Sequence, residues 1–525
     1  MEAQTWAACA AACLIPLALL LLTNHLRRPK LNLPPGPKPW PVIGNFNLIG
    51  PLPHHSIHEL SEKYGPIMTL KFGSIPVIIG STAQMATNFL KNNDEIFAGR
   101  PKTAAGKYTT YNYSNMTWSD YGPYFRQARK LWSMHLFSAK RLESYEYIRV
   151  EELNLVLRDI FNTNGEKITL KDHLSNFSLN VISRVVLGKR YLDKGNDNDN
   201  DNDNDNEHQG KKIVTSKEFK LMLDELFILN GVLNLGDWIP CLKYLDIQGY
   251  VKRMKKVAKK FDRFMENVLD EHNARRAKEK DKWVPKDMVD VLLQYANDPN
   301  HEVKIERDGV KAFTQDLIAG GTDTSTIAIE WAITELIRKP EIIAKATEEL
   351  DHVIGKERWI QEGDIQNLPY IRNIVKETFR LHPVTPLLVP RLSKEQVKVE
   401  GYDIPKGSVV LVNTFTIHRD PNLYEKPQEF CPSRFIEKEN KEVKSQEFEH
   451  LPFGSGRRKC PGYNLGLKII ELCLANLLHG FEWKLPDNIK PDDLDMEEIF
   501  SLANSKKIPL IVCAHPRLPR HMYST

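Results

Sequence analysis

The chain has 525 residues, of which 41% are hydrophobic and 27% are charged, so it is long enough to enclose a large core. Its 72 basic and 68 acidic residues leave a net charge of only +4, which argues against a nucleic-acid-binding protein, because such proteins gain affinity by neutralising phosphates. Seven cysteines without regular spacing indicate neither a disulfide framework nor a cysteine-based zinc site, and a reducing compartment fits them best.

An apolar run opens the chain. The stretch from Trp6 to Leu22 carries no charge, and three basic residues follow it by position 30. Seventeen helical residues span about 25 Å, which suits a thin bilayer such as that of the endoplasmic reticulum, and positive charge stays on the cytosolic side. The run therefore predicts a single-pass anchor over residues 1–26, with the body in the cytosol. A cleaved secretory signal is the alternative, but its positive charge would precede the apolar run.

A proline-rich segment from Leu33 to Pro41 comes next, and it cannot be helical because prolines lack N–H donors. It predicts a stiff hinge over residues 27–42. No linker divides residues 43–525, so we expect one large domain there. In that domain Ile67–Gly73 and Pro76–Ile79 are short β-like runs, while most other periodic segments indicate helices. The predicted fold is mainly α with small β-sheets.

Two segments of this domain are unusual. Residues 195–212 include an uninterrupted alternation of Asn and Asp, which predicts a disordered surface loop; a flexible repeat offers metals no preformed site. The run from Leu226 to Pro240 is apolar but broken by Gly and Pro. It fits contact with a membrane and an ordinary core helix with a turn equally well.

A helical pattern that continues to Ile333 contains the sequence Ala-Gly-Gly-Thr-Asp-Thr-Ser from Ala319 to Ser325, whose glycines and threonines are locally unfavourable in a helix. The glycines allow a flat group to approach the helix, and the hydroxyls can open a local bulge. Asp323 and Thr324 place an acid beside an alcohol, a pair suited to proton transfer. Taken alone, the segment would be interpreted as small-residue packing or as a helix N-cap.

Further along, Glu377 and Arg380 are three residues apart, so a helix brings them within reach of each other. On an exposed helix such a pair would mean little. Phe453 to Gly462 then places Cys460 between glycines and arginines, as a metal-bound thiolate requires. An ordinary buried cysteine explains Cys460 alone, but it does not explain the ten-residue pattern.

These motifs resemble those of the cytochrome P-450 superfamily, the haem-thiolate monooxygenases. Phe453 to Gly462 matches every fixed position of the signature F-x-x-G-x-R-x-C-x-G, and Ala319 to Ser325 resembles the oxygen-activation motif. Glu377 and Arg380 resemble the E-x-x-R motif, and Pro432–Phe435 resembles its P-x-R-F partner. The resemblance extends from residue 34 to the C-terminus and implies the cytochrome P-450 fold with one N-terminal transmembrane helix, of the plant microsomal type.

The resemblance also implies roles for single residues. Cys460 is expected to bind the iron of haem b, and Asp323 and Thr324 to guide protons to dioxygen. An ion-pair network is expected to join Glu377, Arg380 and Arg434. The residues expected to hold the haem are Arg129, Arg391, Phe453, Gly456, Arg458, Cys460 and Gly462. The substrate region is expected to include Tyr108, Tyr111, Tyr113, Phe313, Ala319, Val384, Leu388 and Leu502.

One departure from the family pattern concerns an early helix. The pattern W-x-x-x-R appears here as Phe125 to Arg129, with Phe125 where an indole would donate a hydrogen bond. We expect haem to bind somewhat less tightly, by about 1 kcal/mol for one neutral hydrogen bond. A second departure is Ser433, where glutamate is common.

The chain lacks a dinucleotide fingerprint, so its electrons are expected to come from NADPH through a separate flavoprotein, NADPH-cytochrome P-450 reductase. Basic residues near Arg126 and Arg457 are candidates for the docking face. The resulting hypothesis is a monooxygenase of the endoplasmic reticulum membrane, facing the cytosol, that uses O2 to oxidise an apolar plant specialised metabolite. A terpenoid-derived substrate is favoured, and flavonoid, phenylpropanoid or alkaloid oxidation is the alternative. Two rival hypotheses remain: a haem-thiolate rearrangement enzyme, and a haem-binding scaffold without turnover.

Overall fold

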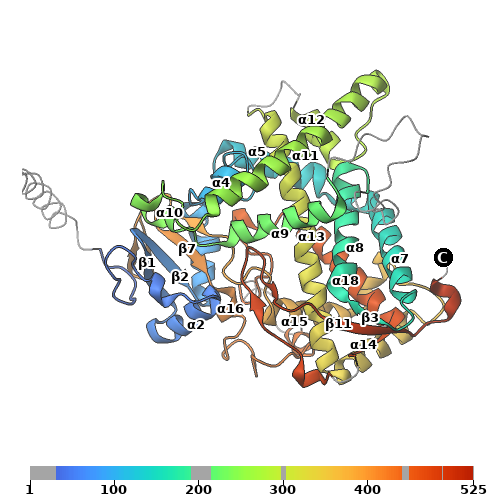
Figure 1. The fold of residues 1–525 in the computed structure, drawn as a ribbon. Helices are drawn as coiled ribbons and strands as arrows, with labels where there is room; N and C mark the ends of the chain where they lie inside the picture. Colours follow the sequence, from blue (N-terminus) through green and yellow to red (C-terminus); the bar gives the residue numbers. More distant parts are fainter. Residues whose placement is uncertain (1–30, 191–213, 297–302, 440–447, 487–488, 524–525) are drawn as a thin grey trace, which may run out of the picture.

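The computed structural model describes residues 31–190, 214–296, 303–439, 448–486 and 489–523. The predicted anchor and the Asn/Asp-rich loop lie outside these ranges. A long helix, α13, runs through the middle of the molecule, with the other helices around it and a small sheet to one side (Figure 1). The helices are α2 (Pro53–Tyr64), α3 (Ala83–Thr87), α4 (Ala104–Thr109), α5 (Pro123–Leu131), α6 (Ala139–Ser144), α7 (Glu146–Phe161), α8 (Leu170–Leu187), α9 (Ser216–Gly231), α10 (Leu235–Trp238), α11 (Tyr250–Glu279), α12 (Met288–Ala296), α13 (Arg307–Arg338), α14 (Pro340–Val353), α15 (Pro369–Leu381), α16 (Thr414–Ile417), α17 (Arg434–Glu439) and α18 (Tyr463–Gly480).

The strands form four small sheets. The largest has the order β1-β2-β7-β4, with β2 parallel to β7 and the other pairs antiparallel. The other sheets have the orders β3-β11-β8, β5-β6 and β10-β9. The strands are β1 (Ile67–Phe72), β2 (Ile75–Gly80), β3 (Lys167–Thr169), β4 (Arg391–Leu392), β5 (Val397–Val399), β6 (Tyr402–Ile404), β7 (Val409–Val412), β8 (Phe481–Lys484), β9 (Glu498–Ile499), β10 (Ser505–Lys506) and β11 (Ile511–Pro516).

The C-terminal half of α13 lies in the core of the molecule. Ile329, Trp331 and Ile333 are at most 1% exposed, and α13 packs against α8 and α18. A helix that is apolar on all sides is stable only when other helices surround it. This burial fixes the position of the glycine- and threonine-rich segment in the middle of α13.

The mainly α fold with small sheets is confirmed, and the two predicted β-like runs pair as β1 and β2. In the apolar run from Leu226, the side chains of Leu226, Phe227 and Leu229 are buried, so the structure favours a core helix there. The described part of the chain contains no helix that is both long and apolar enough to cross a membrane.

An ion-pair network fixes the C-terminal end of α15. The Glu377 carboxylate accepts hydrogen bonds from Arg380 Nε (2.8 Å) and Nη2 (2.9 Å), and from Arg434 Nε (3.0 Å). It also accepts one from the backbone N–H of Cys431 at 2.7 Å. Glu377 and Arg380 are fully buried, and Arg380 donates further bonds to the carbonyl of His418. The network therefore ties α15 to the segment that precedes the cysteine loop (residues 453–462).

Candidate active site

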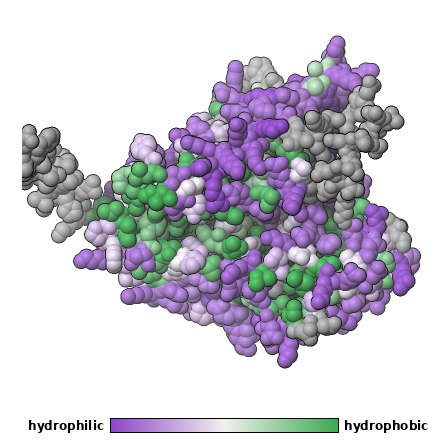
Figure 2. Space-filling model, viewed as in Figure 1, coloured by the Kyte–Doolittle hydropathy of each residue, from purple (hydrophilic) through white to green (hydrophobic). Residues whose placement is uncertain are grey.

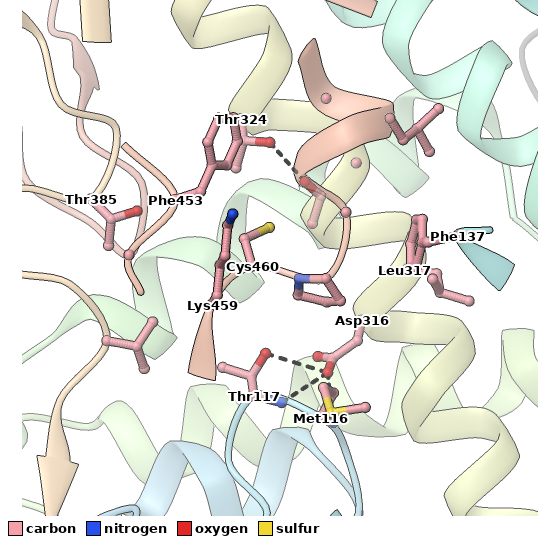
Figure 3. A pocket seen from close by; sticks show the side chains of 18 of the residues that line it. Met116, Thr117, Phe137, Asp316, Leu317, Thr324, Thr385, Phe453, Lys459 and Cys460 are labelled. Carbon is pink, nitrogen blue, oxygen red and sulfur yellow. Dashed lines mark hydrogen bonds between the residues drawn. The ribbon is translucent and has the colours of Figure 1, made fainter. Parts of the chain in front are cut away.

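A cavity of about 290 Å³ separates α13 from the cysteine loop. Cys460 lines one side, and Gly320 and Thr324 of α13 line another. Figure 3 shows Cys460 in this cavity with side chains from α13, from residues 116–117 and from Thr385 around it. The cavity thus brings together the cysteine loop and the glycine- and threonine-rich segment, which are more than a hundred residues apart in sequence.

The backbone of the cysteine loop is shaped by glycine. Gly456 has φ +70°, and a Cβ there would lie 2.2 Å from the carbonyl oxygen of Leu90, so no other residue fits without a shift. The N–H of Cys460 donates to the carbonyl of Phe453 at 3.0 Å, which closes the loop. Helix α18 begins at Tyr463, so its positive N-terminal end lies next to the cysteine.

Cys460 is half-buried, and this burial raises the pKa of its thiol. The backbone N–H of Gly462 and the positive charges of Arg129 and Lys459 act in the opposite direction. Burial dominates for the bare thiol, but a bound metal cation deprotonates a coordinating thiol outright. The loop therefore supplies a sulfur that becomes a thiolate when a metal binds, with N–H groups placed to stabilise its charge.

On the opposite side, α13 is a continuous helix, without the bulge that the sequence allowed. The Thr324 hydroxyl donates to the carbonyl of Gly320 at 2.7 Å. A Cβ on Gly320 would meet no atom within 4 Å, whereas one on Gly321 would lie 2.4 Å from Ile182. Gly320 thus keeps the wall of the cavity flat, and Gly321 lets α8 pack closely.

Asp323 is the neighbour of Thr324 but does not line the cavity as the described residues form it. Its half-buried carboxyl group lies near Asp224, Lys171 and Lys220 of α8 and α9. Burial, with a smaller contribution from the charge of Asp224, raises the pKa of Asp323 to about 6. The alcohol therefore faces the cavity, while a carboxyl group that titrates near neutral pH lies behind it.

Four guanidinium groups gather at one edge of the cavity. Arg391 pairs with Asp94 (Nη1 to Oδ1, 2.8 Å), and Arg458 donates to backbone carbonyls such as that of Ser119 (Nη2, 2.6 Å). Arg100 likewise bonds only carbonyls among the described residues, and no described residue bonds the Arg129 side chain. Burial lowers the pKa of all four, that of Arg458 to about 9, and mutual repulsion adds to the effect for Arg100 and Arg458.

Arg100, Arg129 and Arg458 have no carboxylate partner among the described residues, which indicates anions from a bound group. Buried cations are stable only when they are paired. A haem carries two propionates, its iron accepts a thiolate, and its ring requires a flat space such as the one that Gly320 leaves open. The described residues therefore fit a haem: Cys460 would bind its iron, and Arg100, Arg129, Arg391 and Arg458 would pair with its propionates. Arg100 is the member of this group that the sequence analysis missed.

Phe125, which stands where the family has tryptophan, is 2% exposed and lines the cavity. The guanidinium carbon of Arg458 lies 3.9 Å from the centre of its ring. This cation–π contact holds Arg458 in place and partly compensates for the lost indole N–H. The ring at position 125 thus still has an electrostatic role.

We expect Phe125→Trp to hold haem more tightly. Indole is the best cation–π partner and restores a hydrogen-bond donor, which together amount to about 1 kcal/mol, or roughly fivefold slower haem loss. The rate of haem transfer to apomyoglobin measures this. Phe137→Trp is the matched control, because Phe137 lines the same cavity and, among the described residues, its ring contacts Trp132 and no guanidinium. Equal rates in Phe125→Trp and wild type would contradict the expectation.

Asp316 is a further residue that the sequence analysis missed. It lies two helical turns before Thr324, on the same face of α13, and lines the cavity. Its Oδ1 accepts from Asn115 Nδ2 at 2.7 Å, and its Oδ2 accepts from the N–H groups of Met116 (2.8 Å) and Thr117 (3.1 Å), as Figure 3 shows in part. This carboxyl group therefore binds residues 115–117 to α13 beside the cavity.

We expect Asp316 to make stability depend on pH. Burial raises its pKa from 3.8 to about 6, despite the hydrogen bonds that lower it. Between these two pKa values the carboxyl group is protonated in the folded protein and ionised in the unfolded chain. Its contribution to the free energy of unfolding therefore falls as pH rises from about 4 to above 6, by on the order of 3 kcal/mol. Asp316→Asn lacks this dependence. Urea denaturation of both proteins at pH 5 and 7.5 measures this dependence. If the free energies of unfolding of wild type and Asp316→Asn differ by the same amount at both pH values, the expectation is contradicted.

The predicted substrate residues divide into two groups. Val384 and Leu388 line the cavity. Leu502 lines a second cavity of about 110 Å³, which shares Thr385 and Leu388 with the first and reaches α9 and α10. The two cavities therefore adjoin, and the second offers a path from the surface near α10 to the first.

The other group lies elsewhere. Phe313 is fully buried and its ring lies 5.8 Å from that of Tyr124. Tyr113 donates its hydroxyl to the carbonyl of Thr103 at 2.9 Å, and the Tyr111 ring packs under Lys311. Tyr108 contacts Lys107 and Lys255, and Ala319 also lies outside both cavity linings. Aromatic side chains of α4 and the turn after it thus support the cavity wall from behind.

Comparison with known proteins gives the same assignment as the geometry. Residues 34–511 match the family model described as Cytochrome P450. The chain is 40% identical to trimethyltridecatetraene synthase of Zea mays, with 98% of this chain and 95% of that protein covered. It is also 40% identical to flavonoid 3'-monooxygenase of Petunia hybrida (97% and 96% covered). Dimethylnonatriene synthase of Zea mays is likewise 40% identical (98% and 97% covered).

Among solved structures, a zebrafish cytochrome P450 with abiraterone superposes with a TM-score of 0.72 at 23% sequence identity, covering 89% of this chain and all of that one. At this identity the similarity concerns the fold.

Proposed function

Because this chain belongs to the cytochrome P450 family, as the match over residues 34–511 and the 40% identical relatives show, we propose that it inserts one oxygen atom from O2 into an apolar, terpenoid-derived metabolite at the endoplasmic reticulum membrane. It is a haem-thiolate monooxygenase of plant specialised metabolism that takes its electrons from a separate reductase. The observation that carries the proposal is one cavity enclosed by Cys460 on one side and by Gly320 and Thr324 on the other.

The chain's own residues account for the steps around the cofactor. Bound haem, with Cys460 as its ligand, supplies the activation of O2. The Thr324 hydroxyl lines the cavity and donates its hydrogen to the carbonyl of Gly320. By rotating away from this carbonyl it can donate to a group bound in the cavity. Asp323, with a pKa of about 6, can bind and release protons near neutral pH behind it. Leu317, Val384 and other apolar side chains exclude bulk water.

The lining of the cavity supports an apolar substrate. Six apolar side chains of the cavity lining suit an isoprenoid chain, which offers few hydrogen-bonding groups. They are Met116, Ile182, Val186, Leu317, Val384 and Leu388. A flavonoid is the second candidate, because Thr117, Asp316 and Thr385 offer polar atoms to phenolic hydroxyls in the same cavity.

Surface features support the membrane location. Figure 2 shows apolar side chains gathered on the side of the molecule that carries α10 and the β1–β2 sheet, next to the first described residues. Trp40 and Val42 are 63% and 70% exposed, and Leu245 and Ile247 are 64% and 65% exposed. Exposed apolar clusters of this kind mark interaction surfaces, and this one includes Trp40 and Val42, which follow the predicted anchor in the sequence. The second cavity lies near the same side, at α10, so an apolar substrate can enter from the lipid.

The proposal is tested with the purified full-length protein, a plant reductase and NADPH. We expect terpenoid alcohols of increasing chain length to shift the haem Soret band and to yield oxygenated products, while flavanones give a smaller shift. Shifts and products with flavanones alone would replace the terpenoid assignment with the flavonoid one. Substrate binding without NADPH-dependent product would instead support a rearrangement enzyme or a scaffold.

We expect Thr324→Ala to keep NADPH consumption within about twofold while product per NADPH falls about tenfold, because one general acid–base group contributes 10²–10⁴-fold at most and water replaces part of it. Product and hydrogen peroxide are measured per NADPH. Thr322→Ala is the matched control: its hydroxyl donates to the carbonyl of Ile318 at 2.7 Å and does not line the cavity. Equal coupling in the two variants would count against a proton-transfer role for Thr324.

A further inference from the structure

A cluster of histidines surrounds one carboxylate where α2 meets β9, away from the cavity. His54 and His55 lie at the start of α2, and Glu498 begins β9. His54 Nε2 lies 2.8 Å from Glu498 Oε2, and His55 Nε2 lies 3.6 Å from the same oxygen. One ligand atom of each of the three residues lies within 4.8 Å of the other two. Two imidazoles and a carboxylate are the ligands that zinc accepts at three-residue sites.

The spacing of these atoms fits a shared cation. Two atoms that each bind one zinc ion at 2.0–2.2 Å are at most about 4.2 Å apart, and roughly 3.4 Å apart in tetrahedral geometry. The 2.8 Å and 3.6 Å separations lie on either side of this value. The longer one exceeds a hydrogen bond, so His55 gains no direct bond from its position when the site is empty.

A third histidine lies near the other carboxylate oxygen of Glu498. His382 places Nδ1 4.0 Å from the other carboxylate oxygen, Oε1, and this buried nitrogen has no hydrogen-bond partner among the described residues. Its Nε2 bonds Glu335 Oε1 at 2.7 Å, and its ring stacks on Trp331 at 3.9 Å, so the ring cannot turn freely. The nearby charges of Arg419 and Glu335 are of opposite sign, so their effects on a cation largely offset.

Another cluster of metal-binding residue types shows the contrast. His272, Asp287 and Asp290 also come together. There, however, Arg275 donates to both carboxylates, and His272 uses both ring nitrogens, toward Val268 O and Asp287 Oδ2. That cluster already contains its cation, whereas no guanidinium or ammonium group among the described residues is paired with Glu498.

We propose that His54, His55 and Glu498 bind one Zn²⁺ ion, with water in the fourth position. The His55 side chain is 47% exposed, which gives the ion a path from solvent, while His54 is fully buried. Glu498 lies two residues before Phe500, which lines the second cavity together with Leu502. The ion therefore links α2 to β9, and the residues that follow β9 line the second cavity.

Zn²⁺ titration of tag-free, haem-loaded, metal-stripped full-length protein by isothermal calorimetry tests the site. His55→Ala removes a half-exposed ligand, and the carbon monoxide spectrum of the reduced protein checks that the variant is folded. His58→Ala is the matched control on the same helix, because His58 is engaged with Thr416 (Nδ1 to Oγ1, 3.0 Å). The cysteines and surface groups that also bind Zn²⁺ are the same in all three proteins, so the test depends on the difference in bound Zn²⁺ between them.

We expect wild type and His58→Ala to bind one more Zn²⁺ per chain than His55→Ala, or to bind it at least tenfold more tightly. Mg²⁺ should not compete, and Co²⁺ in place of Zn²⁺ should give the visible bands of a tetrahedral site. Equal stoichiometry and affinity in His55→Ala and wild type would overturn the proposal, as would the absence of any Zn²⁺ binding. Glu498→Gln gives a second check, because it keeps the shape of the side chain and removes its charge.

Discussion

Replacing Glu377 by alanine is expected to lower the free energy of unfolding by about 3–5 kcal/mol and to prevent haem retention. The change leaves the fully buried Arg380 without its carboxylate, and it also deprives Arg434 and the N–H of Cys431 of their acceptor. Because a domain is stable by only about 5–15 kcal/mol, a loss of this size removes most of the margin. Haem content per chain after purification, together with urea denaturation, measures the effect.

Glu62→Ala is the matched control, since its side chain is 70% exposed and belongs to a surface helix. It should change stability by less than about 0.5 kcal/mol. Glu377→Gln should fall between the two, because it keeps the shape and some of the hydrogen bonds but not the charge. Full haem content in Glu377→Ala would show that the network does not position the cysteine loop.

Cys460→Ala is expected to abolish oxygenation, with at least a thousandfold loss of product formation, while the chain still folds. The red-shifted band of the reduced carbon monoxide complex should disappear, because that band requires a thiolate ligand and alanine offers none. Haem should still bind more weakly through the guanidinium cluster and the apolar walls. The difference spectrum and product formation with reductase are measured on the same preparation.

Cys241→Ser is the control for this experiment, since Cys241 is an exposed free cysteine outside both cavities. It should leave the spectrum and the rate unchanged. A Cys460→Ala protein that keeps the red-shifted band would mean that another residue binds the iron, and it would remove the observation on which the proposed function depends.

The features that could be predicted from the sequence depend on short spacings. The pair Glu377 and Arg380 lies three residues apart on one helix, so its geometry follows from the helical repeat. The cysteine loop likewise contains its own constraints, namely the glycine at φ +70° and the helix that begins at Tyr463. Such local patterns fix their own backbone. In the structure the cysteine loop lines the cavity, and the Glu377 network ties α15 to the segment before that loop.

The tyrosines after α4 could not be placed in this way. Tyr111, Asn112 and Tyr113 have φ values of 50°, 54° and 65°, three successive residues in the left-handed region. This turn points the rings away from the cavity toward Lys311 and Thr103, and no local pattern foretells such a turn in residues other than glycine. A run of aromatic residues in the sequence is compatible both with a cavity lining and with core packing, and the structure places these tyrosines outside both cavity linings.

Asp316 was missed for a different reason. A single acidic residue in a helix is normally solvated, and the sequence shows no partner nearby, because its partners are Asn115, Met116 and Thr117 about two hundred residues earlier. The available signal was its spacing of four and eight residues from Gly320 and Thr324, which places all three on one face of α13.

The four guanidinium groups at the edge of the cavity have a consequence for the life of the protein in the cell. Without the propionates of a haem these groups repel one another, so haem binding stabilises the folded form, and its apparent stability rises with the concentration of free haem. Newly made chains that meet no haem stay open to proteases. The abundance of this protein should therefore follow the haem supply of the tissue, even when the rate of its synthesis stays constant.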